Sequence, residues 1–533
     1  MRVEKKVIVL ACSLFLTPTT AIGADVNGAS FTQASNGYVD YHLPSLTATG
    51  DCHDFISLTD FNHSVISSKM IPGDANSSGH CEIHGVIPPE IQYVVNLPKL
   101  WNGRLYMIGN GGFGGQSVYG DYAKEDRAKA KRLGFATAFT NTGHTDDAHF
   151  ASWAHNNIQK EIDYGYRAVH LTAVVAKQLI NRYYGKEPAY SYFEGCSGGG
   201  RQGLVAAQRF PGDFDGIAVG APFYDLPTIE MQSWWNQATA EETPLSAERV
   251  HMLGEIIMEK YDAVDGVRDR VIGNPLAIDF EPARDLPRDT EGKNGFTDAE
   301  IEAFTRIYQG PRIGGRQIAP GLPVGAELPG VRDAGRTYEK TSEASPWSAR
   351  VYREGSGYNM TLEILESWLK YMAFATDDPD YDWKNLNMET DLEKMQPMGH
   401  IMNAKETDLS PVMNRGNKIL MYHGWADVGV SPIMTVQYYE QVMETMGEKT
   451  QSFFRTFMVP GMFHCRGGRN VDHFDVMTTL IDWVEAGIMP ERIEAARIEN
   501  GEVVRTRPLC PYPQVAAYQG RGSTDKAENF TCQ

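Results

Sequence analysis

The chain has 533 residues, of which 42% are hydrophobic and 22% are charged. This ordinary globular composition provides enough apolar material for a large core, in two domains or in one large domain with an insertion. The 68 acidic residues outnumber the 49 basic ones, and the formal net charge of −19 disfavours nucleic acids and anionic membranes as partners.

The first residues have the pattern of a secretory signal. Three basic residues come before an apolar stretch from Val7 to Leu16, and small residues follow as far as Ala24. We expect residues 1–23 to be removed and the mature chain to be secreted or periplasmic. A lipoprotein modified at Cys12 is the alternative, but the apolar run before this cysteine is short for that signal. No later stretch has the roughly 18 to 20 consecutive apolar residues that cross a bilayer.

The middle of the chain alternates helix and strand patterns. Apolar periodicity predicts a helix over 163–184, with Gly185 at its C-cap. A strand over 189–193, a glycine-rich turn, a helix over 201–209 and a strand over 214–219 follow. This order is typical of a mostly parallel α/β sheet.

The pattern is interrupted between residues 223 and 410, where charge, turns and scattered aromatic residues replace it. It returns with a strand over 418–423 and a helix over 471–485. We therefore expect an α/β-hydrolase fold with a large inserted lid domain over 223–410. The catalytic domain would then consist of residues 24–222 and 411–533.

The glycine-rich turn carries the first candidate for chemistry. Residues 195–199 read Gly-Cys-Ser-Gly-Gly, which fits G-x-S-x-G between a strand and a helix, the context of a nucleophile elbow. Glycines are needed there because the turn is strained and two segments approach closely around the serine. The alternative is a glycine-rich turn in which Ser197 is incidental.

A serine nucleophile needs a histidine base and a carboxylate that orients it, and in this fold they follow in the order Ser, Asp, His. Asp427 comes just after the strand over 418–423, and the carboxyl ends of strands are where α/β sheets place their active sites. His464 lies in a turn-rich loop after the apolar run 453–459. We predict that Ser197, Asp427 and His464 form a catalytic triad. A structural histidine is the default interpretation of His464 taken alone.

The cysteines support this assignment. Loss of residues 1–23 removes Cys12 and leaves six of the seven cysteines, an even number that favours three disulfides in an exported chain. Cys196 directly precedes Ser197 and Cys465 directly follows His464, so a bond between them would join the two catalytic loops. A buried free thiol at Cys196 is the alternative. No C-x-x-C pair indicates a structural zinc site.

Several segments together resemble the tannase and feruloyl esterase family, which includes a hydrolase of mono(2-hydroxyethyl) terephthalate. The matching segments are Trp101-Asn102-Gly103-Arg104, residues 109–115, Asn141-Thr142-Gly143-His144, Gly195-Cys196-Ser197, His423-Gly424-Trp425-Ala426-Asp427 and His464-Cys465. The resemblance implies the bridge Cys196–Cys465 and suggests Cys52–Cys81 and Cys510–Cys532 as the other two.

Residues 109–115, Gly-Asn-Gly-Gly-Phe-Gly-Gly, resemble the glycine-rich oxyanion loop of esterases. We expect the N–H of Gly111 or Gly112 to join that of Gly198 in binding the oxyanion. Taken alone, the segment could be a flexible turn. It lacks the G-x-G-x-x-G spacing of a dinucleotide site.

A calcium site is expected in the lid segment. The candidate ligands are the carboxylates of Asp262, Asp265 and Asp269 with the carbonyls of Val267 and Val271, hard oxygen donors of the kind that Ca²⁺ prefers. The spacing is not that of an EF-hand, and a solvated acidic turn is the alternative. The family resemblance favours calcium, in a structural role.

These observations predict a secreted serine carboxylester hydrolase that acts through an acyl-enzyme. The resemblance implies small-molecule esters of aromatic acids such as ferulate, coumarate or gallate, or alternatively terephthalate half-esters, without a redox or organic cofactor. A serine peptidase and a non-catalytic phenolic-binding protein on the same fold are the readings from other classes. Aromatic stacking by Trp234, Trp235 and Trp368 is weighed against ordinary core packing, which we favour. The sequence does not indicate the oligomeric state.

Overall fold

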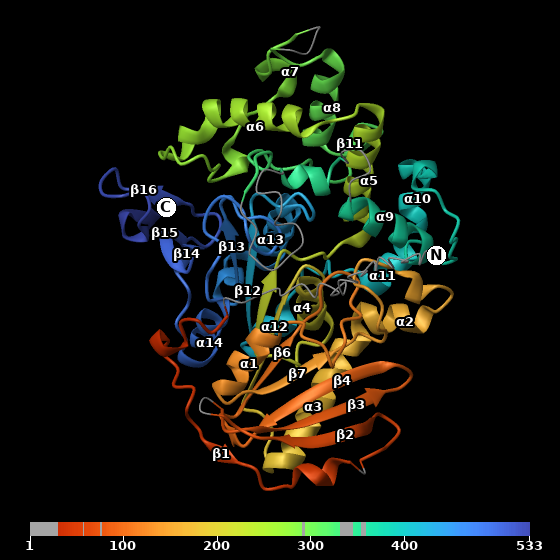
Figure 1. Cartoon of the computed structure of the whole chain (residues 1–533), viewed down its shortest axis with the longest axis vertical. Coiled ribbons are helices and arrows are strands. Elements are labelled where there is room, and N and C mark those ends of the chain that lie inside the picture. Colours follow the sequence, from red (N-terminus) through yellow and green to blue (C-terminus); the bar gives the residue numbers. More distant parts are fainter. Residues whose placement is uncertain (1–29, 57, 75–76, 290–293, 331–344, 353–358) are drawn as a thin grey trace, which may run out of the picture.

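The computed structural model describes residues 30–56, 58–74, 77–289, 294–330, 345–352 and 359–533. The predicted signal segment, residues 1–23, lies outside these ranges. Figure 1 shows a large sheet with its helices in the lower part of the molecule and a mainly helical segment above it.

The described residues form a nine-stranded mixed sheet. Its strands, in spatial order, are β13 (Phe454–Val459), β12 (Lys418–Gly424), β9 (Gly216–Gly220), β8 (Tyr190–Cys196), β6 (Arg104–Ile108), β7 (Ala136–Thr140), β4 (Ile91–Pro98), β3 (His80–Ile87) and β2 (Ser64–Ile71). The strands from β13 to β7 run parallel, whereas β4, β3 and β2 are antiparallel to their neighbours. The parallel half of the predicted sheet is confirmed, and the antiparallel strands add an extension that the periodicity did not predict.

Helices cover both faces of the sheet, because its parallel strands are apolar on both sides. One face packs against α3 (Ala168–Tyr184), α4 (Gly198–Arg209) and α13 (Pro432–Met446), and the other against α1 (Lys124–Arg132) and α14 (Val476–Ala486). Neighbouring strand residues alternate between the two cores, as Met107 and Ile108 do. The α/β-hydrolase fold expected from the sequence is thus present.

Three helix starts differ from the prediction. The helix expected over 201–209 begins at Gly198, directly after Ser197. The helix expected from residue 163 begins earlier, as α2 (Ile158–Ile162), and continues through a π-helical turn over 163–167 into α3, which ends at Gly185 with φ of 69° as expected. The helix expected from residue 471 begins at Val476, because Asp475 caps it by accepting a hydrogen bond from the N–H of Thr478.

Within the lid segment, residues 223–410, the described residues (223–289, 294–330, 345–352 and 359–410) form a helical layer beyond the carboxyl ends of the parallel strands (Figure 1). Its helices are α5 (Leu226–Glu242), α6 (Ala247–Tyr261), α7 (Pro282–Asp285), α8 (Asp298–Gln309), α9 (Met360–Tyr371), α10 (Met388–Lys394) and α11 (Gln396–Met402), with the short hairpin β10 (Arg312–Ile313) and β11 (Arg316–Gln317); α12 (Ser410–Arg415) then leads back into the sheet. A core of its own, which includes Phe304 and Trp347, also takes in Ala426 and Phe463 from the loops after β12 and β13. The lid segment therefore packs directly on the loops that carry Asp427 and His464.

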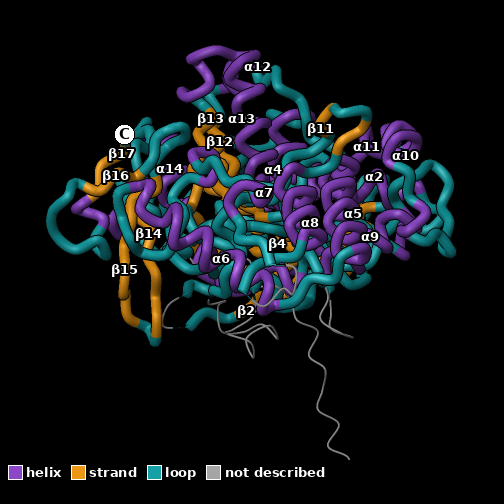
Figure 2. The backbone as a smooth tube through the Cα atoms, turned by 90° about the horizontal axis from the view of Figure 1, so that it is seen from above, coloured by secondary structure: helices purple, strands orange, loops and turns teal. Residues whose placement is uncertain are grey.

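Short strand pairs complete the molecule. They are β1 (Leu46–Thr47) with β5 (Leu100–Trp101), β14 (Ile493–Glu499) with β15 (Glu502–Leu509), and β16 (Ala516–Tyr518) with β17 (Phe530–Cys532). Figure 2 shows the β14–β15 ribbon extending along one side of the molecule, next to the C-terminus.

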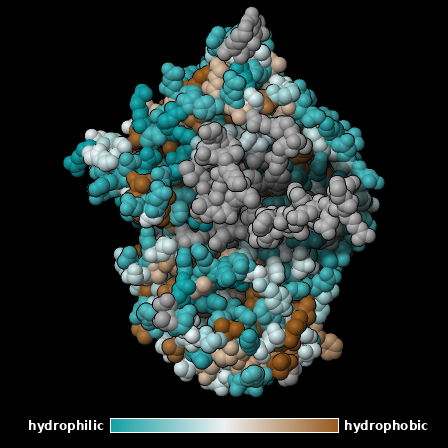
Figure 3. Space-filling view, viewed as in Figure 1, coloured by the Kyte–Doolittle hydropathy of each residue, from teal (hydrophilic) through white to brown (hydrophobic). Residues whose placement is uncertain are grey.

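On the face drawn in Figure 3, the coloured residues are mostly hydrophilic, in keeping with the acidic composition. Its exposed apolar side chains include Phe61 and Ile66 near the outer strand β2. Within the described ranges, we find no helix with the length and apolar character needed to span a membrane.

Candidate active site

Ser197 occupies a sharp turn between β8 and α4. Its φ of 63° and ψ of −120° are unusual for a residue with a side chain. Backbone hydrogen bonds fix the turn: the N–H of Ser197 donates to Gly220 (3.0 Å), and the N–H of Phe223 donates to the carbonyl of Ser197 (3.1 Å). A Cβ atom at position 200 would lie 2.2 Å from the Gly220 oxygen, so this position requires glycine. The strand, turn and helix are those of a nucleophile elbow.

The glycine-rich loop after β6 is anchored so that two N–H groups remain available. The N–H groups of Asn110, Phe113, Gly114 and Gly115 donate to Gln202 Oε1 (2.9 Å) and to the carbonyls of Ala148 (2.7 Å), Gly111 (3.0 Å) and Asn141 (3.1 Å), respectively. The N–H groups of Gly111 and Gly112 make no hydrogen bond to any described residue. Unpaired backbone donors of this kind can bind an oxyanion, as the sequence predicted for these two glycines.

Gly198 lies directly against this loop, since a Cβ atom there would be 2.3 Å from the Gly112 oxygen. Its own N–H is in the first turn of α4, where helix N–H groups have no partner within the helix. The structure therefore brings all three predicted oxyanion residues together beside Ser197.

We predict that Gly198→Ala lowers kcat by roughly a hundred- to a thousandfold, the usual effect of losing one oxyanion donor. The added methyl group would displace the Gly112 peptide. Steady-state kinetics on a soluble ester would measure the loss, with Gly212→Ala as the control, because a Cβ atom there meets its nearest neighbour, the Arg415 guanidinium, at an ordinary contact distance of 3.6 Å. A Gly198→Ala enzyme with parental kcat would contradict the assignment.

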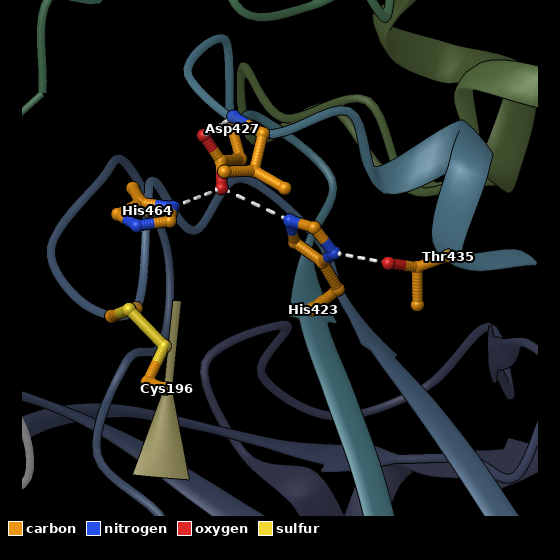
Figure 4. The surroundings of a disulfide bond; sticks show 7 residues. Cys196, His423, Asp427, Thr435 and His464 are labelled. Carbon is orange, nitrogen blue, oxygen red and sulfur yellow. Dashed lines mark hydrogen bonds and ion pairs between the residues drawn. A yellow bond between two sulfur atoms is a disulfide. The ribbon is translucent and has the colours of Figure 1, made fainter. Parts of the chain in front are cut away.

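Three disulfides are present, Cys52–Cys81, Cys196–Cys465 and Cys510–Cys532, and all three expected pairings are confirmed. The Cys196–Cys465 bond joins the residue before Ser197 to the residue after His464 over a Cα–Cα distance of 6.1 Å. The free-thiol alternative for Cys196 is thus wrong. The bridge holds the nucleophile turn against the histidine loop, as Figure 4 shows.

Asp427 lies between two histidines (Figure 4). Its Oδ2 atom is 2.5 Å from His464 Nδ1 and 3.0 Å from His423 Nε2. Its Oδ1 atom accepts the N–H groups of Gly429 (2.8 Å) and Val430 (3.1 Å). Because a carboxylate can only accept, both imidazole nitrogens facing Oδ2 carry hydrogen. His464 is thereby held in the tautomer that leaves its Nε2 free to act as a base.

The electrostatics agree with an ionised Asp427 and a neutral His464. Burial would raise the pKa of the Asp427 carboxyl, but the hydrogen bonds from both histidines, and the attraction to His464 when that imidazole is protonated, hold it well below its usual value. Burial lowers the pKa of the His464 imidazole despite the opposing effect of Asp427, and Arg350 adds to the lowering. A neutral imidazole is the form that can accept a proton.

The Ser197 hydroxyl makes no hydrogen bond to His464 or to any other residue that the structure describes. Its position is fixed by the backbone, and the adjacent disulfide brings the two loops together. Hydrogen bonds between catalytic groups are often long or absent before substrate binds. Attack on an ester requires the Ser197 hydroxyl to come within hydrogen-bonding reach of His464 Nε2 when substrate binds.

Some residues near the site were not identified from the sequence. In the sequence, His423 stands out only as the first residue of the segment 423–427, and its place at the end of the buried strand β12 is the one signal that the sequence offers for it. Arg350, from the lid segment, lies close to the Asp427 loop, because a Cβ atom at position 429 would be 2.8 Å from its guanidinium. Glu230 on α5 is 1% exposed and is close enough to Arg350 to feel its charge, and burial raises the pKa of this carboxyl to about 8.

The predicted calcium ligands lie at the end of α6. Asp262 Oδ1 accepts the N–H of Val271 (3.2 Å) and Asp265 Oδ1 accepts the N–H of Val267 (3.0 Å). Asp269 instead forms ion pairs with two arginines of β15, Arg507 (2.8 Å) and Arg505 (3.6 Å). In the described ranges, no set of three or more His, Cys, Asp or Glu side chains gathers as a metal site requires.

Other features of this loop fit a cation. Burial and the neighbouring Asp269 and Asp262 raise the pKa of Asp265 to about 6, so negative charge is concentrated there. Asp265, Val267, Asp269 and Val271 all line a cavity of about 180 Å³ between the lid segment and the C-terminal strands. The loop thus places oxygen atoms that could bind a cation around this cavity. Asp269, however, is already paired with Arg507 and Arg505.

The three tryptophans serve packing, as favoured. Trp234 donates its indole N–H to the carbonyl of Trp383 (2.9 Å), and Trp235 donates to Arg306 (2.8 Å). Trp368 is 1% exposed within the main core.

The sequence and the fold are both similar to those of known esterases. Residues 75–533 match the family model described as tannase and feruloyl esterase. The chain is 31% identical to an uncharacterized esterase of Xanthomonas campestris pv. campestris, with 92% of each chain covered. It is 31% identical to the mono(2-hydroxyethyl) terephthalate hydrolase of Piscinibacter sakaiensis, over 85% of this chain and 84% of the relative.

Among solved structures, feruloyl esterase B from Aspergillus oryzae superposes with a TM-score of 0.76 at 25% identity, covering 90% of this chain and 99% of that one. The likeness extends over nearly the whole chain and includes both the sheet and the lid segment.

Proposed function

Because the chain belongs to the tannase and feruloyl esterase family and is a carboxylic ester hydrolase, we propose that it hydrolyses esters of aromatic acids with Ser197, His464 and Asp427 as its triad. One observation carries the proposal: the Asp427–His464 contact of 2.5 Å is joined to the Ser197 turn by the Cys196–Cys465 bridge.

The reaction is acyl transfer to water. His464 Nε2 removes the hydroxyl proton of Ser197, whose oxygen attacks the ester carbonyl. The N–H groups of Gly198 and of Gly111 or Gly112 bind the oxyanion. His464 then protonates the leaving alcohol, and the acyl group stays on Ser197. Water repeats the sequence, releasing the acid and restoring the serine, so no redox or organic cofactor is consumed.

Two relatives support the proposed substrate class. A feruloyl esterase and a mono(2-hydroxyethyl) terephthalate hydrolase both act, as their names state, on esters of an aromatic acid. We propose hydroxycinnamic, gallic or related acyl groups for this chain, with the half-ester activity as the second candidate because of the 31% identical relative.

The test is a panel of methyl ferulate, methyl gallate, mono(2-hydroxyethyl) terephthalate and methyl butyrate, with the matching anilides. Faster hydrolysis of an aromatic ester than of methyl butyrate supports the proposal and ranks the acyl groups. A preference for methyl butyrate would overturn the aromatic class. Faster cleavage of anilides than of esters would indicate a peptidase, and silence on every compound would favour a binding protein.

We also propose that the mature protein is secreted or periplasmic. The three disulfides fit an oxidising compartment. N-terminal sequencing of the exported protein would test the expected start near residue 24.

Calcium is proposed as a structural ion at the loop 262–271, held by Asp262, Asp265 and the carbonyls of Val267 and Val271, with Asp269 released from Arg507 to join them. Its role is to brace the lid segment against the C-terminal strands, which face each other across the cavity. The ion takes no part in the reaction.

Removal of calcium is expected to lower the melting temperature by a few degrees. An ion present at a hundred times its dissociation constant stabilises the folded state by about 2.7 kcal/mol. Thermal unfolding with chelator, then with added Ca²⁺ or Mg²⁺, measures the effect, and metal analysis gives the stoichiometry. Asp265→Asn should remove the calcium response. A melting temperature that ignores chelator, in a protein without bound calcium, would refute the site.

A further inference from the structure

His423 is a histidine buried at the end of β12 that the reaction, as described so far, does not use. Its side chain is 0% exposed. Its Nε2 atom is 3.0 Å from Asp427 Oδ2, and its Nδ1 atom is 2.8 Å from the hydroxyl oxygen of Thr435 on α13. Figure 4 shows the line Thr435, His423, Asp427, His464, in which Asp427 is shared by the two imidazoles.

The hydrogen-bonding roles in this line follow from its chemistry. Asp427 can only accept, so His423 Nε2 carries hydrogen and donates it. In a neutral imidazole the other nitrogen then accepts, and the Thr435 hydroxyl donates to Nδ1. His423 is thus fixed at both ends between a rigid helix and the carboxylate.

The second donor matters because His464 changes state during the reaction. Asp427 Oδ1 is held by the N–H groups of Gly429 and Val430, but Oδ2 contacts only the two histidines among the described residues. His464 gains and loses a proton in each half of the reaction. His423 is therefore the partner of Oδ2 that stays constant while the bond to His464 changes.

We propose that His423 is a positioning residue of this catalytic centre. It holds the Asp427 carboxylate in the orientation that binds His464, and its hydrogen bond to Oδ2 weakens the attraction of Asp427 for the His464 proton. The proposal rests on the triad assigned under the proposed function. It assigns no contact between His423 and substrate, and its effect passes through Asp427.

The positioning role of His423 predicts a change in the pH dependence of kcat/KM. The charged and titratable groups that act on His464 are Asp427, His423 and, from the lid segment, Arg350. Loss of the His423 donor leaves Oδ2 with more of its negative charge for His464, which favours the imidazolium. The pKa of His464 then rises, and because the base must be neutral, the acidic limb of kcat/KM moves to higher pH.

Two amide variants of His423 test which of its two hydrogen bonds, to Asp427 or to Thr435, the reaction needs. The amide nitrogen of His423→Gln falls near the position of Nε2, so it can still donate to Asp427. The amide of His423→Asn falls near Nδ1, so it can meet Thr435 but not Asp427. Both variants are polar and neutral, and they differ mainly in which partner they can reach.

We expect His423→Asn to lower kcat about a hundredfold, the scale of a small misplacement of catalytic groups, with little change in KM and an acidic limb at higher pH. His423→Gln should keep kcat within about tenfold of the parent and retain its pH profile. Rates are divided by the concentration of active sites, counted from the burst of a p-nitrophenyl ester, so that misfolded protein does not enter kcat.

The control is His63→Asn, which also removes a buried histidine bonded to a hydroxyl, that of Tyr93 (2.9 Å), before the outer strand β2. It should retain the kcat and pH profile of the parent. Equal kcat per active site in His423→Asn and the parent would overturn the positioning role, as would equal losses in the Asn and Gln variants. Activity that persists in Ser197→Ala would instead overturn the triad, and the proposal with it.

Discussion

Replacement of Ser197 by alanine is expected to lower kcat about a million-fold, the scale on which a serine hydrolase loses activity with its nucleophile. Alanine keeps the Cβ atom and removes only the oxygen that attacks the ester. The backbone bonds of the turn, from Ser197 to Gly220 and from Phe223 to Ser197, do not involve the hydroxyl. The fold and the oxyanion donors should therefore persist.

The measurement is hydrolysis of the best ester in the panel, with enzyme concentrations high enough to follow a slow reaction. Ser452→Ala is the matched control, since its hydroxyl donates only to the carbonyl of Lys449 on the exposed turn before β13. The control should be fully active. If Ser197→Ala keeps a tenth of the parental rate, another group is the nucleophile and the elbow has only a structural role.

The parts of this site that the sequence predicted are those carried by short motifs. The glycines after Ser197 lie so close to Gly112 and Gly220 that a side chain would not fit. The run of glycines in the sequence therefore marks this turn. Cys196 and Cys465 flank the nucleophile and the base, and the resemblance to the family implied their pairing, which the structure shows. Asp427 comes directly after a strand, where the topology of the sheet brings loops together.

The parts that the sequence did not predict depend on contacts between distant segments. Arg350 approaches the Asp427 loop from the lid segment, and nothing in its neighbouring residues marks it. Arg505 and Arg507 reach Asp269 from β15, more than 230 positions further along the chain. Such pairings are set by tertiary packing and leave no periodic pattern. For this reason the sequence did not indicate that Asp269, one of the predicted calcium ligands, is paired with arginines.

The role of His423 was missed for a different reason. It belongs to β12, and a histidine at the end of an apolar strand is usually read as part of that strand. Only the turn after Gly424, closed by the bond from the Asp427 N–H to the Gly424 carbonyl (3.2 Å), brings residues 423 and 427 face to face.

Asp427→Asn is expected to lower kcat about ten-thousandfold, the loss seen when a triad aspartate becomes an amide and the histidine adopts the wrong tautomer. The surroundings of Asp427 make this replacement especially unfavourable. Both oxygens accept N–H groups, from Gly429 and Val430 on one side and from the two histidines on the other. The asparagine NH₂ must face one of these pairs.

If the NH₂ faces the histidines, the His464 Nδ1 atom must accept from it and therefore cannot carry hydrogen. The imidazole hydrogen then lies on Nε2, the atom that has to accept the serine proton. If it faces the backbone, two buried N–H groups lose their acceptor, at about 1–3 kcal/mol for each unsatisfied group. We therefore expect a lower melting temperature together with the loss of kcat.

Kinetics and thermal unfolding of Asp427→Asn, with Asp408→Asn as the control, measure both effects. Asp408 is an exposed carboxylate that accepts the N–H of Ser410 (3.0 Å), so its amide variant keeps an acceptor and should match the parent. A stable Asp427→Asn enzyme with kcat within tenfold of the parent would mean that His464 does not need this carboxylate. That result would remove the basis for the positioning role of His423, since the hydrogen bonds that connect it to His464 run through Asp427.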